Sequence, residues 1–142
     1  MSTKPSLSLR RHIKASPARI FRAWTEPAQI LKWIRPADTE MLHAEMDARV
    51  DGRFRMLMRG ASGEEHDVSG RYLEVVPDAR LVFTWAWRST PERESLVTID
   101  LRPDGEGTLL TLTHEQFFDE AARDRHQQGW NSWLDCLERY FA

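Results

Sequence analysis

From about residue 40 to residue 115, apolar and polar side chains alternate, and this alternation constrains the fold more than any other feature of the sequence. A period of two is typical of β-strands with one buried face. Phe54, Met56 and Met58, for example, share one face of such a strand, and arginines take the other. Short turns such as Pro103 to Gly105 separate the strands. Since parallel strands need long crossover connections, these strands are expected to form an antiparallel sheet.

Three helices are predicted around this sheet. Ser16-Pro17 begins a short helix after a strand at 7–14, because serine caps the helix and proline suits its first turn. Pro27 begins a second short helix, which Pro36 ends. After Phe118 the period changes to 3.6, which predicts a long helix. Its apolar stripe consists of Trp130, Trp133, Leu134, Leu137 and Phe141.

A sheet with one apolar face needs a cover, and the C-terminal helix is the one long element able to provide it. We therefore predict a single α+β domain over residues 1–142, in which a curved antiparallel sheet of six to seven strands wraps around that helix. The two short helices follow the first strand. Gly129 weakens a helix by about 1 kcal/mol relative to alanine, and we interpret it as a point where another backbone comes close.

Charge and composition narrow the classes of function. The net charge is −2 with acids and bases interspersed, which argues against a nucleic-acid partner. No apolar run approaches the roughly 18 residues of a membrane span, and no secretory signal is visible near the N-terminus. Cys136 is the single cysteine, so no internal disulfide can form. We expect a cytoplasmic protein without a membrane partner. The sequence leaves a homodimer possible and does not decide the oligomeric state.

The familiar catalytic and metal-binding motifs do not occur in the sequence. There is no nucleophile elbow G-x-S-x-G and no phosphate-binding G-x-x-x-x-G-K. His114-Glu115 could begin the zinc motif H-E-x-x-H, but Phe118 stands where the second histidine is needed. The five histidines show no metal-ligand spacing with one another or with Cys136. We predict no metal and no cofactor.

Several short segments, in a fixed order, resemble a known superfamily. They are Ser16–Pro27 with Lys32-Trp33, Asp47 with Arg49–Phe54, Gly70–Val75, Leu81–Trp85, Gly107-Thr108 through His114-Glu115, and Gly129-Trp130. Over residues 7–141 this pattern resembles the START-like (SRPBCC) superfamily, and within it the branch related to the C-terminal domain of the activator of Hsp90 ATPase. The resemblance implies a helix-grip fold with a hydrophobic cavity between sheet and long helix. Asp51-Gly52 stands where the family usually has two glycines.

The candidate ligand-binding residues lie on the predicted inner faces of the sheet and the long helix. They are Met56, Met58, Tyr72, Phe83, Trp85, Trp87, Leu112, His114 and Trp130. Six tryptophans are many for 142 residues. Trp85 and Trp87 form either a flat wall that stacks on a ligand or ordinary core. Met56 and Met58 either adapt to a ligand or fill gaps in the core.

The polar candidates also have two interpretations each. Tyr72 is either a polar group inside an apolar cleft or a hydroxyl that reaches solvent at the sheet edge. His114 continues the inward register of Leu110 and Leu112, which places it at a cavity mouth, where it could orient a ligand or act as a general base. A histidine at a strand end can equally be a surface residue. Trp130 either anchors the helix or contacts the ligand.

Three functions follow from these observations. The preferred hypothesis is a binding protein for a small apolar molecule held by the candidate residues. The second is a protein-interaction module that acts on a chaperone such as Hsp90, as the resemblance implies. The third is an enzyme, a cyclase or hydrolase that pairs His114 with a carboxylate such as Glu45 or Glu115, although no assembled acid–base pair is visible in the sequence.

Overall fold

The computed structural model describes residues 4–35 and 38–142. Within them the elements follow the predicted order, with boundaries shifted by a few residues: β1 Leu7–Ile13, α1 Pro17–Thr25, α2 Pro27–Trp33, β2 Thr39–Met46, β3 Arg53–Gly60, β4 Glu65–Val76, β5 Arg80–Trp87, β6 Ser95–Asp104, β7 Gly107–Glu115 and α3 Glu120–Tyr140. Pro36, predicted to end the second helix, lies outside the described residues. None of the helices in these ranges is both long enough and apolar enough to cross a bilayer.

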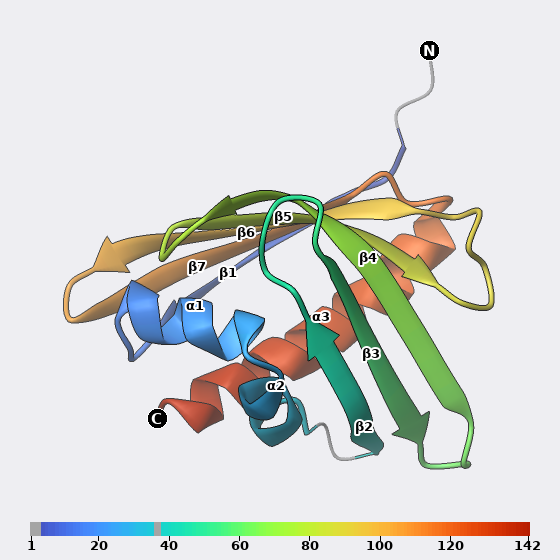
Figure 1. Cartoon of the computed structure of the whole chain (residues 1–142), viewed down its shortest axis with the longest axis horizontal. Helices are drawn as coiled ribbons and strands as arrows, with labels where there is room; N and C mark the ends of the chain where they lie inside the picture. Colours follow the sequence, from blue (N-terminus) through green and yellow to red (C-terminus); the bar gives the residue numbers. More distant parts are fainter. Residues whose placement is uncertain (1–3, 36–37) are drawn as a thin grey trace.

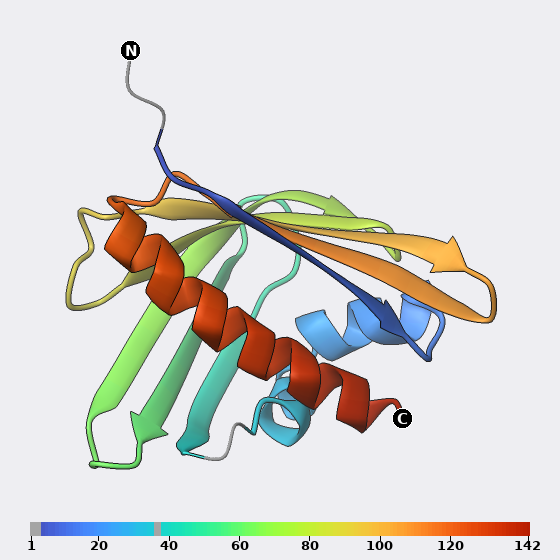
Figure 2. The same cartoon turned by 180° about the vertical axis from the view of Figure 1, so that it is seen from behind.

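The sheet is antiparallel and strongly curved, as predicted. Its strand order is β1-β7-β6-β5-β4-β3-β2. The part formed by β2, β3 and β4 turns away from the part formed by β1, β7 and β6, and α3 crosses the resulting concave face (Figures 1 and 2). The short helices α1 and α2 lie on the same side of the sheet, near the C-terminal end of α3. This confirms the predicted α+β fold with a long C-terminal helix held by the sheet.

The curvature has local causes in the sequence. The register of β4 against β5 shifts between Tyr72 and Glu74, and such a bulge bends and twists a strand. Gly70 in β4 permits the close approach of β5, since a Cβ atom there would overlap the carbonyl oxygen of Thr84. Asp51, where the resemblance leads us to expect glycine, adopts a φ of 69°, in the left-handed region that glycine favours.

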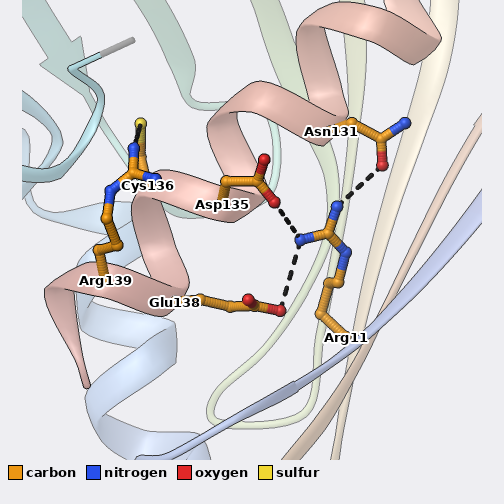
Figure 3. A network of polar contacts seen from close by, with 6 residues as sticks. All are labelled: Arg11, Asn131, Asp135, Cys136, Glu138 and Arg139. Atoms are coloured by element: carbon orange, nitrogen blue, oxygen red, sulfur yellow. Dashed lines mark hydrogen bonds and ion pairs between the residues drawn. The ribbon is translucent and has the colours of Figure 1, made fainter. Parts of the chain in front are cut away.

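A polar network ties α3 to the edge strand β1 (Figure 3). Arg11 of β1 donates from Nη1 to Asp135 at 2.7 Å and to Glu138 at 3.4 Å. Its Nη2 donates to the side-chain oxygen of Asn131 at 2.8 Å. All three partners project from α3 toward one guanidinium. We call these four residues the Arg11 clamp, and it fixes one side of α3 against the sheet.

Candidate functional site

An open cavity lies between α3 and the strands β2, β3, β4 and β5. Its volume is about 280 Å³. Its walls are formed by Thr39, Met58, His66, Trp85, Trp87, Arg125, His126, Gly129, Trp130 and Trp133. We call it the outer cavity. Aromatic and thioether side chains dominate its walls, which is typical of sites for small organic molecules.

A second space, the inner chamber, lies deeper, toward α1 and α2. It is lined by Trp24, Ile30, Ile34, Met46, Phe54, Met56, Tyr72, Leu81, Phe83, Trp85, Trp130 and Trp133. Its volume is only about 20 Å³. A space of this size accommodates about one water molecule. The interior is therefore close-packed at this end and open at the other.

Trp85 forms the partition between the two spaces. It is 3% exposed and lines both of them. Its ring centroid lies 5.0 Å from that of Trp130 and 6.2 Å from that of Trp133. The ring of Trp87 meets it edge-on at 5.6 Å. Such tilted and edge-to-face arrangements are the favoured geometries of aromatic pairs, so this wall is well ordered.

A directional chain of hydrogen bonds lies behind Trp130. The Nε1 group of Trp130 donates to Nδ1 of His114 at 2.9 Å. Since Nδ1 accepts, the neutral imidazole carries its proton on Nε2, which donates to the Ser95 hydroxyl at 2.7 Å. The hydroxyl in turn donates to the carbonyl oxygen of Trp85 at 3.2 Å. Both ring nitrogens of His114 are therefore satisfied by protein groups.

A second tryptophan–histidine pair stands at the cavity wall. Trp87 donates from Nε1 to Nε2 of His126 at 2.9 Å. The other ring nitrogen, Nδ1, donates to the carbonyl oxygen of Ala122 one turn earlier in α3 at 2.7 Å. This pair joins the half-buried end of β5 to α3. Two of the tryptophans that line the outer cavity are thus each oriented by a histidine.

Burial keeps both histidines neutral. His114 is 0% exposed, and burial, with a smaller contribution from the neighbouring His126, lowers its pKa from 6.5 to about 2. Burial also lowers the pKa of His126. Burial raises the pKa of the Tyr72 hydroxyl, and the nearby Asp47 carboxylate adds to the effect. None of these groups is prepared to exchange a proton near neutral pH.

The structure distributes the nine predicted site residues over three places. Met58, Trp85, Trp87 and Trp130 line the outer cavity. Met56, Tyr72 and Phe83 line the inner chamber, together with Trp85 and Trp130. Leu112 and His114 line neither space and belong to the buried interior.

Both positions expected for His114 are wrong, and so is one of the two expected for Tyr72. His114 is neither at a cavity mouth nor on the surface, because Trp130 covers it and its polar atoms bond to Ser95 and Trp130. Tyr72 does not reach solvent at a sheet edge, since it is 3% exposed in the inner chamber. The location of His114 also removes the basis for the predicted general base. Glu45, one proposed partner, instead lies 3.2 Å from Nε2 of His43.

Other cavity residues were missed at the level of sequence. His126 and Gly129 lie four residues before Trp130 and Trp133, so extending the apolar stripe of α3 backward would have found both. His66 lies opposite Met58 in the β3–β4 pairing. Gly129 was interpreted as a point of close backbone approach, which is wrong, because a Cβ atom there would meet nothing within 4 Å. Gly129 lines the cavity, and a side chain there would have open space around it.

No metal centre is found in the part of the chain that the structure describes. Residues 4–35 and 38–142 contain no group of three or more His, Cys, Asp or Glu side chains able to hold an ion. Cys136 is buried and has a guanidinium nitrogen of Arg139 at 3.4 Å from its sulfur. The candidate site is therefore the aromatic outer cavity.

The architecture defines a helix-grip protein, in which a curved antiparallel sheet holds a long C-terminal helix over a cavity. Within that class the chain belongs to the family described as "Activator of Hsp90 ATPase homolog 1-like protein", whose sequence model matches residues 14–142. This confirms the resemblance found in the sequence.

Solved structures support the same assignment. A protein from Chromobacterium violaceum is 31% identical, with a TM-score of 0.87 and 96% of each chain covered. The AHSA1 protein from Silicibacter pomeroyi is 27% identical, with a TM-score of 0.84 and 96% of each chain covered. An AHSA1-like protein from Aeromonas hydrophila, at 24% identity and a TM-score of 0.80 over 96% of this chain and 91% of its own, shares the fold. No protein of curated function matches the chain.

Proposed function

We propose that this chain binds a small, largely apolar molecule in the outer cavity. The observation that carries the proposal is an unfilled aromatic space of about 280 Å³ beside an inner chamber of about 20 Å³. A concave space with mostly apolar, aromatic walls and a few polar groups is the usual form of a small-molecule site. The volume is near the lower end of the roughly 300–1,000 Å³ of typical ligand pockets, which favours a compact ligand.

The walls of the cavity are suited to binding without large rearrangement. The rings of Trp87 and Trp130 are held in place by His126 and His114. A pre-oriented wall loses little conformational freedom when a ligand arrives, and this improves affinity. Met58 adds a flexible thioether that can adapt to the shape of the ligand. The chain thus combines rigid aromatic faces with one adaptable side chain.

The proposal is tested by titrating the protein with compact apolar molecules that do not themselves fluoresce, such as cyclohexanol and camphor, while tryptophan emission is recorded. We expect a saturable change with one ligand per chain, because four of the lining residues are tryptophans. The change in emission should also be larger than the change that the same compounds cause in a solution of free tryptophan, because the indoles of the cavity wall are held in place by histidines. A linear, non-saturating response to every compound would contradict the proposal.

The family description favours a second candidate function, contact with the chaperone Hsp90. This function needs an outer surface rather than a cavity, so the two candidates can be separated. Addition of the purified chain to an Hsp90 ATPase assay should change the rate of ATP hydrolysis if the chaperone is its partner. An unchanged rate over a wide range of chain concentration would remove this candidate and leave ligand binding unaffected.

A further inference from the structure

We infer that the ligand of the outer cavity is an amphipathic anion, in which an apolar body carries one carboxylate or comparable acidic group that Arg125 binds at the cavity mouth. The inference rests on the proposed function and names the chemical class of its ligand. It is carried by the distribution of charge and of hydrogen-bond donors over the cavity walls.

The charge on the lining residues has one sign. Arg125 is the charged member of the set, His66 and His126 are the titratable ones, and among the residues that the structure describes no aspartate or glutamate lines the cavity. The chain as a whole has slightly more acids than bases, so a wall without a carboxylate is not a consequence of composition. An uncompensated positive charge at the mouth of an apolar space favours a ligand with a negative group.

Arg125 is available to such a group. None of the ion pairs formed within residues 4–35 and 38–142 involves Arg125. By contrast, Arg123, two residues earlier on α3, pairs with Asp124 at 3.1 Å. His66 at the same mouth has the carboxylate of Glu64 at 3.7 Å, so it is partly compensated. A guanidinium binds a carboxylate through two parallel hydrogen bonds.

The inner wall also provides a donor without a partner. Nε1 of Trp85 is buried and makes no hydrogen bond with the described residues. The corresponding groups of Trp87 and Trp130 are already used by the two histidines. Trp24, whose buried Nε1 also has no partner among the described residues, lines only the inner chamber, which is too small for a ligand. Trp85 lines both spaces, so the inference rests on Arg125, and the free Nε1 group of Trp85 adds only that this wall has an unused donor.

The test compares two probes that differ in a single charged group. Anilinonaphthalene sulfonate is an apolar anion, and phenylnaphthylamine is its uncharged parent. Both fluoresce on transfer to an apolar site, so dissociation constants can be measured for the native chain and for Arg125→Gln. Arg139→Gln is the matched control, because Arg139 lies on the same helix and outside the cavity.

We expect the native chain to bind the anionic probe more tightly than the neutral one, and Arg125→Gln to weaken the anionic probe about fivefold. The affinity of the neutral probe should stay unchanged, and Arg139→Gln should affect neither. The advantage of the anion should also shrink at high salt, since exposed charges are screened. If the native chain binds both probes equally and Arg125→Gln changes neither affinity, the inference is overturned and the proposed function stands. Binding of neither probe would overturn both.

Discussion

The outer cavity and the inner chamber share three tryptophans, Trp85, Trp130 and Trp133, yet one is open and the other is filled. The difference comes from what lies opposite these rings. In the inner chamber the ring of Phe54 meets that of Phe83 edge-on at 5.2 Å. In the outer cavity the facing position on α3 is Gly129, which has no side chain to place there. Large aromatics therefore do not by themselves define a pocket.

A large effect of a single substitution is expected from two methionines on one strand. Met56 and Met58 are 5% and 3% exposed, but Met56 lines the inner chamber and Met58 the outer cavity. Met56→Ala should lower the free energy of unfolding by about 2–5 kcal/mol, because the deletion leaves a closed void. Met58→Ala should cost less, since the removed atoms adjoin a space that is already open. Chemical denaturation measures both, and equal losses would contradict the distinction.

The same pair also separates packing from binding. Met58→Ala should change the affinity for an apolar probe, because this side chain lines the outer cavity, where the proposed function places the probe. Met56→Ala should leave that affinity unchanged when the chain is folded. The reverse result would place the ligand in the inner chamber.

The next effect is a dependence of stability on pH, and it comes from the buried His114 behind the cavity wall. The pKa of His114 is about 2 in the folded chain, below its ordinary value of 6.5, so the unfolded chain binds a proton that the folded chain does not. This contribution to stability is fully present above pH 6.5 and is lost as the pH falls toward 2. The free energy of unfolding should fall by up to about 1.4 kcal/mol for each pH unit in that range.

His126 should add to this loss, because its pKa is also lowered. His114→Gln removes the larger contribution and should flatten the profile, at the cost of lower stability at neutral pH. The measurement is urea denaturation at a series of pH values. A native profile that is flat below pH 6.5 would show that His114 is not held neutral.

A smaller effect concerns the closed side of α3. Arg11→Gln breaks the Arg11 clamp and should cost about 1 kcal/mol of unfolding free energy, since the clamp combines two carboxylates and an amide around one partly buried guanidinium. Arg10→Gln is the matched control, because Arg10 is the neighbouring residue on β1 and contacts no part of the clamp. If both variants lose the same stability, the clamp does not fix α3.

The smallest expected effect on stability has the opposite sign. Gly129→Ala should raise the free energy of unfolding by about 0.5–1 kcal/mol, because alanine is the better helix former and its Cβ atom meets open space. Thermal and chemical denaturation measure the gain. A loss of stability would show that the helix is closer to its neighbours at Gly129 than the structure places it.

The sequence predicts the fold well because the signals for it are local. Alternation, proline at helix starts and short turns each depend on a few neighbouring residues. The site is different, because Leu112 and His114 share the inward register of the sheet but lie under α3 rather than beside the cavity. Which inward side chain is covered depends on where the helix crosses the sheet. The periodicity of the sequence does not contain the place where the helix crosses the sheet. For the same reason it does not show that Met56 lines the inner chamber and Met58 the outer cavity.

The most direct test of an open, ligand-binding outer cavity is the binding of phenylnaphthylamine to the native chain and to Gly129→Leu. Leucine at this position fills space that is otherwise empty and is a better helix former than glycine, so the variant should be folded and at least as stable. We predict one saturable site in the native chain and its loss in Gly129→Leu. Equal binding to both proteins, or saturable binding to neither, would contradict the account.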